Sequence, residues 1–296
     1  QGATLKPPSF EYAAPKTVDE AVSLLKQHEG EAKILAGGQS LMPLLNMRLA
    51  RPGLLVDVAR VDGLDFIREV EGSVTIGAMT RQRSVEFSEL VRTRYPLLHA
   101  ATHHIAHPQN RNQGTVGGSL AHADPAAELP ATALAMDAEF RAVGPNGERR
   151  IKAADFFVTY LTTALEPSEV LTEVRFPALP ARGGWSFIEL ARRHGDFALA
   201  GVVTYLTLDG GRRCSGARIV LFGVGATPVR AAAAERLLVG DTLGDTLFEH
   251  AGRTASEEID EPLSDVHASA EYRRDLARVL TRRALAEAAS RAAAAA

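Results

Sequence analysis

The segment from Ile34 to Leu45, ILAGGQSLMPLL, interrupts apolar sequence with two adjacent glycines and two small polar residues. Residues 32–38 read as a short buried strand that stops at Gly37 and Gly38. Adjacent glycines can make an ordinary turn, or they can let backbone N–H groups come close to a bound group. Taken alone the segment favours the turn, so its interpretation depends on the rest of the chain.

A second segment repeats the theme further along the chain. In residues 112–130, NQGTVGGSLAHADPAAELP, Gly117 and Gly118 lie between two hydroxyl residues, Thr115 and Ser119. Consecutive free N–H groups suit a pyrophosphate, so two such loops fit a pair of backbone sites around one anionic group. The residues therefore predict a dinucleotide held between two glycine loops.

Acidic residues follow the second loop. Asp124 and Pro125 have the form of a helix start, with Asp at the N-cap and Pro at the first helical position. Glu128 falls one turn further on, where its carboxylate can meet ribose or ribityl hydroxyls. The alternative for Glu128 is simple favourable placement near a helix N-terminus.

Composition limits the classes of function. The chain has 296 residues and is 46% hydrophobic, which is enough for about two domains. With 33 basic and 36 acidic residues it has no sequence-wide field for nucleic acid or an anionic membrane. No apolar run approaches the roughly 20 residues of a membrane helix, and no secretory signal opens the sequence. We expect a cytoplasmic protein that binds no nucleic acid and has no integral membrane segment.

Metal sites are poorly supported. Cys214 is the single cysteine, which excludes a disulfide within the chain and an iron-sulfur or zinc site held by several of its thiolates. His103 and His107 have the spacing of one helical face, but Pro108 follows directly and favours a structural or solvent-facing role. Redox chemistry would need an organic cofactor, or a partner that carries the metal.

The common catalytic motifs are missing. The sequence has no G-x-x-x-x-G-K-[ST] and no G-x-G-x-x-G; residues 223–228, GVGATP, place Pro228 where the third glycine belongs. Neither G-x-S-x-G nor H-E-x-x-H occurs. Hydrolase and zinc-peptidase functions therefore lack their usual support.

Hydrophobic periodicity divides the chain into three regions. In residues 1–58, a helix with a capping box at Thr17 and an end at Gly30 alternates with strands, which indicates an α/β unit. Residues 59–178 read as α+β, with hairpins that turn at Glu71-Gly72 and at 144–147 and a broken helical stretch between them.

The C-terminal region follows a Pro- and Gly-rich linker at 177–184. Three strands are expected in succession, with a turn at Asp209-Gly210-Gly211 between the second and third. Helices are expected from Thr227-Pro228, over 245–258 and from Ala270, with a frayed end at RAAAAA. Strands and helices in separate blocks indicate a terminal α+β domain.

Long segments of the chain closely resemble one known family. LAGGQSLMPLLNMRLARPGLLVDV (35–58) and PQNRNQGTVGGSLAHADPAAELP (108–130) are similar to the FAD-binding medium subunit of molybdenum hydroxylases, the xanthine dehydrogenase and carbon monoxide dehydrogenase family. The likeness continues through TTALEPSEVLTEVRFP (162–177) and FIELARRHGDFALAGV (187–202), so it covers nearly the whole chain.

The resemblance implies an α+β protein with a two-subdomain FAD-binding fold of the PCMH/vanillyl-alcohol-oxidase type. Subdomain 1 would be residues 1–58 and subdomain 2 residues 59–178, with FAD between them. A C-terminal flavoprotein domain, residues 183–290, would add a three-stranded antiparallel sheet with helices and close over the flavin ring.

The same resemblance implies the cofactor contacts. The first loop, wrapping the diphosphate, would be Ala36, Gly37, Gly38, Gln39, Ser40 and Leu41. The second would be Gly114, Thr115, Val116, Gly117, Gly118 and Ser119. Ile105 and Ala106 would line the cofactor, Asp124 and Glu128 would lie near its sugar and ribityl hydroxyls, and Leu171 beside the isoalloxazine.

Two positions depart from the family pattern. Ser119 stands where many relatives have Asn, which reaches further. Some relatives place a Lys near the flavin in the segment that here contains Glu189, with Arg192 as the nearest cation in sequence.

The function implied is electron relay. A large molybdopterin subunit would hydroxylate the substrate, and a small subunit with two-iron two-sulfur clusters would pass the electrons to FAD on this chain. FAD would deliver them to NAD, a quinone, a cytochrome or oxygen, and the complex would be a dimer of heterotrimers. The cofactor carries such chemistry, so no catalytic acid or base and no metal is expected on this chain.

Two other functions remain open. One is a self-contained FAD-dependent oxidase or reductase of the same fold, which would need its own substrate pocket. The other is a cofactor-free assembly subunit that only holds partners together.

Overall fold

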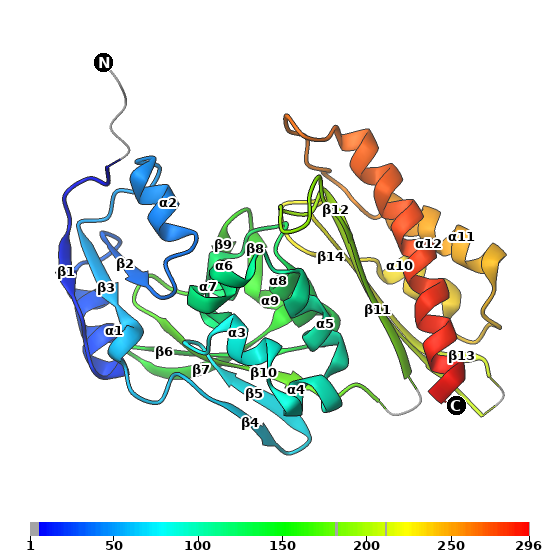
Figure 1. Ribbon diagram of the computed structural model, residues 1–296, viewed down its shortest axis with the longest axis horizontal. Coiled ribbons are helices and arrows are strands. Elements are labelled where there is room, and N and C mark those ends of the chain that lie inside the picture. Colours follow the sequence, from blue (N-terminus) through cyan, green and yellow to red (C-terminus); the bar gives the residue numbers. More distant parts are fainter. Residues whose placement is uncertain (1–5, 181–182, 211, 296) are drawn as a thin grey trace.

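Three of the four β-sheets in the described residues follow one another, with their helices, along the long axis of the molecule (Figure 1). The structure is a computed structural model that describes residues 6–180, 183–210 and 212–295. Residues 181–182 of the expected linker and Gly211 of the expected turn lie outside the described residues. In the part of the chain that is described, no helix combines the length and the apolar character needed to cross a membrane.

The first sheet is small and parallel. In sheet order its strands are β1 (Glu11–Ala13), β3 (Leu54–Asp57) and β2 (Ala32–Leu35). Helix α1 (Val18–Gln27) buries Ala21, Val22 and Leu25. Thr17 caps it as expected, since its Oγ1 accepts from the Glu20 N–H at 3.2 Å. Helix α2 (Leu41–Asn46) follows the first glycine loop, and a 3-10 turn, η1 (Val58–Arg60), leads onward.

The central sheet is antiparallel. In sheet order its strands are β4 (Ile67–Val70), β5 (Ser73–Gly77), β10 (Val170–Pro177), β6 (Glu139–Gly144) and β7 (Gly147–Lys152). Both expected hairpins are present. Glu71 and Gly72 turn the first with φ of 50° and 70°, and Gly147 helps to turn the second with φ of 103°.

Helices cover one side of the central sheet in Figure 1. They are α3 (Gln82–Glu86), α4 (Glu89–Arg94), α5 (Pro96–His104), α6 (Pro108–Gln113), α7 (Val116–His122), α8 (Glu128–Ala135) and α9 (Ala153–Phe156). The expected break at Tyr95-Pro96 separates α4 from α5. A short hairpin, β8 (Phe157–Thr159) with β9 (Thr162–Thr163), completes this region.

The expected helix start at Asp124-Pro125 is wrong. The Asp124 side chain caps a turn instead, accepting from the Ala126 N–H at 2.9 Å, and α8 begins only at Glu128. The Pro125 carbonyl accepts from the Gly223 N–H of the C-terminal region at 2.7 Å. This contact with a distant segment keeps the turn non-helical, and local sequence rules do not detect it.

The C-terminal sheet has four antiparallel strands, one more than expected. They are β11 (Gly183–Leu190), β12 (Ala200–Leu208), β13 (Cys214–Phe222) and β14 (Val229–Arg230). The expected helix start at Thr227-Pro228 is wrong, because Val229 pairs with Leu221 and extends the sheet. The helix begins after this strand, at Ala232.

Helices α10 (Ala232–Leu238) and α12 (Ala270–Ala295) cover the outer face of that sheet, and α11 (Asp245–Glu257) packs on these two helices (Figure 1). The alanine-rich end of α12 is helical through Ala295, where fraying was expected. Ala288 and Ala292 are fully buried against β11. A Cβ at Gly184 would lie 2.9 Å from the Ala288 carbonyl carbon, so the glycine permits close helix-strand packing.

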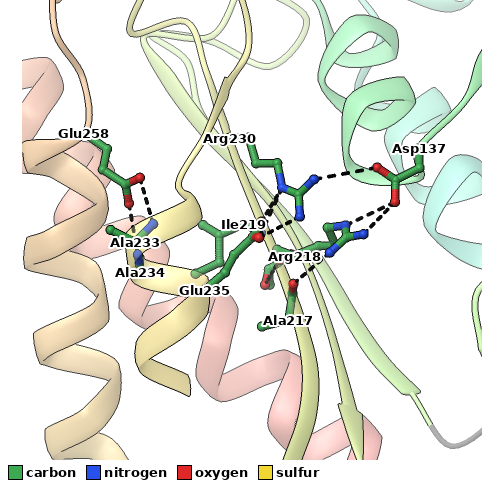
Figure 2. Close-up of polar contacts among 10 residues, drawn as sticks. Asp137, Ala217, Arg218, Ile219, Arg230, Ala233, Ala234, Glu235 and Glu258 are labelled. Atoms are coloured by element: carbon green, nitrogen blue, oxygen red, sulfur yellow. Dashed lines mark hydrogen bonds and ion pairs between the residues drawn. The ribbon is translucent and has the colours of Figure 1, made fainter. Parts of the chain in front are cut away.

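An ion-pair network joins the central and C-terminal regions (Figure 2). Asp137, which follows the C-cap of α8, accepts from Arg218 of β13 at 2.7 Å and lies 3.9 Å from Arg230 of β14. Glu235 of α10 holds Arg230 from the other side at 2.9 Å. Asp137 has a φ of 50°, a conformation that Asp and Asn tolerate well.

Replacement of Asp137 by Asn should weaken this junction. Asn keeps the left-handed backbone but removes the charge, and because Asp137 is about half exposed we expect a loss of only about 0.5–1 kcal/mol in the free energy of unfolding. Urea unfolding at low and at 1 M salt would measure it, and the difference should fade at high salt. Glu71→Gln is the control, since Glu71 also has positive φ but joins no two regions. Equal effects of both variants would contradict the assignment.

Candidate functional site

The two glycine loops contact each other through bare backbone. A Cβ at Gly37 would overlap the Gln113 carbonyl oxygen and lie 2.9 Å from the Gly114 Cα. A Cβ at Gly118 would lie 3.4 Å from the Ala36 Cβ. The contact between the loops therefore requires glycine at Gly37, and the fold brings together residues that are about 80 positions apart in the sequence.

Side chains reinforce the contact between the loops. The Asn110 amide donates to Gln39 Oε1 at 3.2 Å, and Gln39 in turn donates to the Gly37 carbonyl at 3.3 Å. Arg81 donates to the Gln113 carbonyl. Asn110 and Arg81 were not predicted as site residues, because neither belongs to a glycine loop.

The first loop presents free backbone donors. Among the described residues, no hydrogen-bond acceptor faces the N–H groups of Gly38, Gln39 or Ser40. Gly38 is left-handed, with φ of 72°, and α2 starts at the next apolar residue, Leu41. Successive N–H groups in such a turn form a concavity that suits an anion.

The second loop differs from the expectation. The Val116 N–H donates to the Thr80 carbonyl at 2.9 Å, that of Gly117 to Ala78 at 2.8 Å, and that of Gly118 to Thr115 Oγ1 at 3.1 Å. Consecutive free N–H groups are therefore absent from Val116–Gly118. A Cβ at Gly117 would lie 2.7 Å from the Ala78 Cα, so this glycine serves close packing of α7 on the chain after β5.

Two half-buried hydroxyl groups remain available, one from each loop. In the described part of the chain, neither the Ser40 nor the Ser119 hydroxyl makes a hydrogen bond. In the second loop the Ser119 hydroxyl is therefore available to a ligand, whereas the N–H groups of Val116–Gly118, which were expected to be free, are not.

A strained turn lies between the loops in sequence. Ala106 has a φ of 41°, which is unusual for a residue with a Cβ. Arg111 donates to the carbonyls of Ile105 at 2.7 Å and Ala106 at 3.3 Å, and its other nitrogens hold Glu86 at 2.9 and 3.0 Å. These hydrogen bonds lower the pKa of Glu86. Sequence reasoning missed Arg111 and Glu86, because no spacing rule links positions 86 and 111.

Two buried carboxyl groups belong to this part of the molecule. Glu128 is only 7% exposed, and burial together with the Glu189 carboxylate raises the pKa of Glu128 to about 8. Glu189 comes from β11 and its side chain is 8% exposed, with Oε1 3.2 Å from His104 Nδ1. Its Oε2 is buried and has no hydrogen-bond partner among the described residues.

The other candidate residues lie at different depths. Leu171 is buried in β10 and belongs to the same core cluster as Ile105 and Val116. Asp124 is half-buried, and its negative charge contributes to the raised pKa of Glu128. Arg192 is exposed and pairs with Asp196 at 3.6 Å, so it does not neutralise Glu189.

The histidines do not form a metal centre. His103 lies in α5, which ends at His104, whereas His107 precedes α6, so they share no helical face. The described residues contain no group of three or more His, Cys, Asp or Glu arranged to hold a metal ion. His107 instead packs under Gly195, and its ring lies 6.4 Å from that of His194.

The donor set fits a dinucleotide such as FAD. Free N–H groups after Gly37 suit phosphate oxygens, and the two free serine hydroxyls lie on the facing loops. The unpaired Oε2 of Glu189 offers a buried acceptor for a ligand N–H or O–H.

Comparison with known proteins covers nearly the whole chain. Residues 8–179 match the family described as FAD binding domain in molybdopterin dehydrogenase, and residues 185–288 match the CO dehydrogenase flavoprotein C-terminal domain. The 6-hydroxypseudooxynicotine dehydrogenase complex subunit alpha of Paenarthrobacter nicotinovorans is 44% identical over 97% of both chains.

Solved structures agree with these matches. A chain of carbon monoxide dehydrogenase from Hydrogenophaga pseudoflava superposes with a TM-score of 0.93 at 43% identity, covering 96% of this chain and 99% of that one. A chain of quinoline 2-oxidoreductase from Pseudomonas putida 86 gives a TM-score of 0.92 at 38% identity, covering 97% and 99%.

Proposed function

The chain belongs to the family of FAD-binding medium subunits of molybdenum hydroxylases, and from this premise we propose the arrangement of its cofactor and partners. It is the FAD subunit of a multi-subunit oxidoreductase. Its electrons come from iron-sulfur clusters on a small subunit, which receives them from a large molybdopterin subunit. The complex is a cytoplasmic dimer of heterotrimers, and an external acceptor takes the electrons from FAD.

The cofactor lies over the contact between the glycine loops. The N–H groups of Gly38, Gln39 and Ser40 hold the phosphates, supported by their lack of any acceptor among the described residues. The remaining contacts follow the resemblance: Ala36, Gly37, Leu41, Ile105, Ala106, Gly114, Thr115, Val116, Gly117, Gly118, Ser119, Asp124, Glu128 and Leu171.

The residues of this chain bind and orient, while FAD when bound supplies the redox chemistry. The hydroxyl of Ser119 donates a hydrogen bond to the cofactor. The N–H groups of the preceding residues, Val116–Gly118, already bond within the protein, so this hydroxyl is the donor that the second loop supplies. Arg111 holds the Ile105–Ala106 turn in its strained form against the cofactor. Buried apolar groups such as Leu171 exclude water from the ring.

The chain does not select the substrate. Its relatives are named for 6-hydroxypseudooxynicotine, carbon monoxide and quinoline, which share no common shape or polarity. Flavin subunits that are this similar accompany unlike reactions, so substrate choice lies on the large subunit. The region boundaries that we propose, 1–58, 59–178 and 183–290, are supported by the position of each sheet.

The observation that best supports FAD binding by this chain is the set of free N–H groups of Gly38, Gln39 and Ser40 in the first loop. Reconstitution of the purified chain with FAD should give a yellow protein with about one FAD per chain. Co-expression with a small cysteine-rich chain and a large chain encoded beside it should yield a complex whose flavin is reduced by substrate. A chain that stays colourless after incubation with FAD would favour a cofactor-free assembly subunit. Oxidation of a small hydride donor by the isolated chain would favour a self-contained oxidase or reductase.

A further inference from the structure

The Glu189 carboxylate has one oxygen that no group of the protein uses. Glu189 lies in β11, on the same face of the strand as Phe187 two residues earlier. Phe187 belongs to the central core cluster together with Ile105. The Glu189 side chain is only 8% exposed, and its Oε2 has no hydrogen-bond partner among the described residues. A buried carboxylate oxygen without a donor is unfavourable, so this position suits a donor that comes from a ligand.

The other oxygen of this carboxylate is held by α5. Glu189 Oε1 lies 3.2 Å from Nδ1 of His104, the last residue of α5. The His104 ring packs against Phe187, with ring centroids 4.8 Å apart. Ile105 follows directly in the chain and begins the turn that Arg111 holds. The carboxylate is therefore fixed from one side, and Oε2 is the atom that remains for a ligand.

No cation of the chain competes for Oε2. Within the described ranges, His104 is the one basic side chain that pairs with Glu189. Arg192 follows Glu189 closely in sequence, but it is exposed and pairs with Asp196 at 3.6 Å. An N–H group of a ligand can therefore bond to Oε2 without displacing an ion pair.

The oxidised flavin ring matches a single acceptor of this kind. Its isoalloxazine carries one N–H group, at N3, and a carbonyl group lies on each side of it. Two free carboxylate oxygens would bring one of them against a carbonyl oxygen of the ring, whereas Glu189 presents only Oε2 because His104 holds Oε1. Hydrogen bonds and charges at the ring nitrogens are the means by which a protein tunes a bound flavin.

We propose that Glu189 Oε2 accepts a hydrogen bond from the N3–H group of the flavin ring, and that His104 orients the carboxylate for this contact. The assignment rests on the proposed function, which places FAD at the Ile105–Ala106 turn and its phosphates at the first glycine loop. Glu189 is then a cofactor-binding residue, and His104 is a positioning residue that acts through it.

The first experiment compares FAD with FAD methylated at N3, which cannot donate this hydrogen bond. The FAD-free full chain is titrated with each flavin, and flavin fluorescence gives the dissociation constants. Wild type should bind the methylated flavin about tenfold more weakly or worse, because the methyl group meets a buried acceptor. Glu189→Leu removes the acceptor, so its two dissociation constants should agree within about threefold. Glu189→Gln keeps a neutral acceptor and should retain part of the discrimination.

The outcomes separate this assignment from the proposed function. If wild type binds both flavins equally well, the N3 contact is wrong although the chain binds FAD. The same holds if Glu189→Leu folds, as circular dichroism would show, and still discriminates as strongly as wild type. If wild type binds neither flavin, the proposed function fails and this assignment fails with it. Glu257→Gln, at an exposed position of α11, is the control and should follow wild type.

The second experiment measures the midpoint potential of the bound flavin against a redox dye. Reduction adds negative charge to the ring, and a carboxylate against N3 opposes it. Glu189→Gln should therefore favour the reduced flavin by about tenfold relative to wild type, which is about 30 mV for two electrons. Glu257→Gln should leave the potential unchanged. An unchanged potential in Glu189→Gln would overturn the contact between this carboxylate and the ring.

Discussion

Replacement of Gly37 by valine should abolish FAD binding while leaving most of the chain folded. Even a Cβ at this position overlaps the Gln113 carbonyl oxygen and lies 2.9 Å from the Gly114 Cα. Both neighbours are backbone, so they cannot rotate away, and the two glycine loops must separate. Overpacking of this kind costs about 1–3 kcal/mol, and with the cradle opened we expect FAD affinity to fall by at least about 100-fold.

The measurement is the FAD content after reconstitution, together with a dissociation constant from flavin fluorescence. Gly38→Val should also weaken FAD binding, because Gly38 has a φ of 72° that valine does not adopt readily. Its nearest neighbours are flexible side chains, so its effect should be smaller than that of Gly37→Val. Gly244→Val is the matched control, since no atom lies within 4 Å of a Cβ there and its φ is extended. Retention of full flavin by Gly37→Val would show that the first loop does not hold the cofactor.

Replacement of Arg111 by methionine should strongly destabilise the chain and its FAD site together. Arg111 is 5% exposed and Glu86 is 8% exposed, so the variant leaves a buried carboxylate without its hydrogen-bonded cation and with only the more exposed Arg83, 3.9 Å away. Breaking a buried pair in this way costs about 3–5 kcal/mol. The Ile105 and Ala106 carbonyls lose their donor as well, so the strained turn should relax and FAD affinity should fall.

The sign of the pH dependence makes this test specific. The lowered pKa of Glu86 means that its pair with Arg111 stabilises the chain above pH 4.5, and that this contribution is lost as pH falls through the folded pKa. Urea unfolding should show a large gap between wild type and Arg111→Met at pH 7 and a smaller gap near pH 4. Adding Glu86→Gln to Arg111→Met should recover part of the loss at pH 7, because no buried charge then remains unpaired.

An exposed pair of the same residue types provides the control. Arg92 and Glu89 lie 2.6 Å apart on the surface of α4, and Arg92→Met should lower the free energy of unfolding by less than about 1 kcal/mol. Arg111→Lys keeps the charge but lacks the planar fork of donors, so it should restore stability only partly. If Arg111→Met lowered the free energy of unfolding no more than Arg92→Met does, the buried pair of Arg111 and Glu86 would not support the Ile105–Ala106 turn.

The elements that the sequence predicted correctly depend on neighbouring residues. The Thr17 cap, the Glu71-Gly72 turn and the break at Pro96 are each determined within a few residues of chain. Each uses a local rule that needs no distant partner: a side chain on its own helix end, positive φ in a tight turn, or a missing N–H. The repetition of Gly-Gly with hydroxyl residues was equally visible and, with the family resemblance, led to the FAD subunit.

The errors occurred where distant segments meet. Asp124 and Pro125 form a turn because the Gly223 N–H donates a hydrogen bond to the Pro125 carbonyl. Val229 lies in a strand because it pairs with Leu221 at the edge of β13. The glycines of the second loop were predicted to expose free N–H groups. Gly117 is instead needed because α7 packs closely on Ala78 and leaves no room for a side chain. A sequence shows that a residue is small, but not what approaches it.

The sequence by itself determined the family, the cofactor and the two loops that meet. Local propensities, a repeated glycine motif and a single cysteine depend only on the order of the residues, so they can be read without a structure. Only the tertiary structure decided which polar groups are free in each loop, that Arg111 holds Glu86, and that the carboxyl groups of Glu128 and Glu189 are buried. Charge and hydrogen bonding act through space, and burial removes the water that would otherwise screen and satisfy such groups.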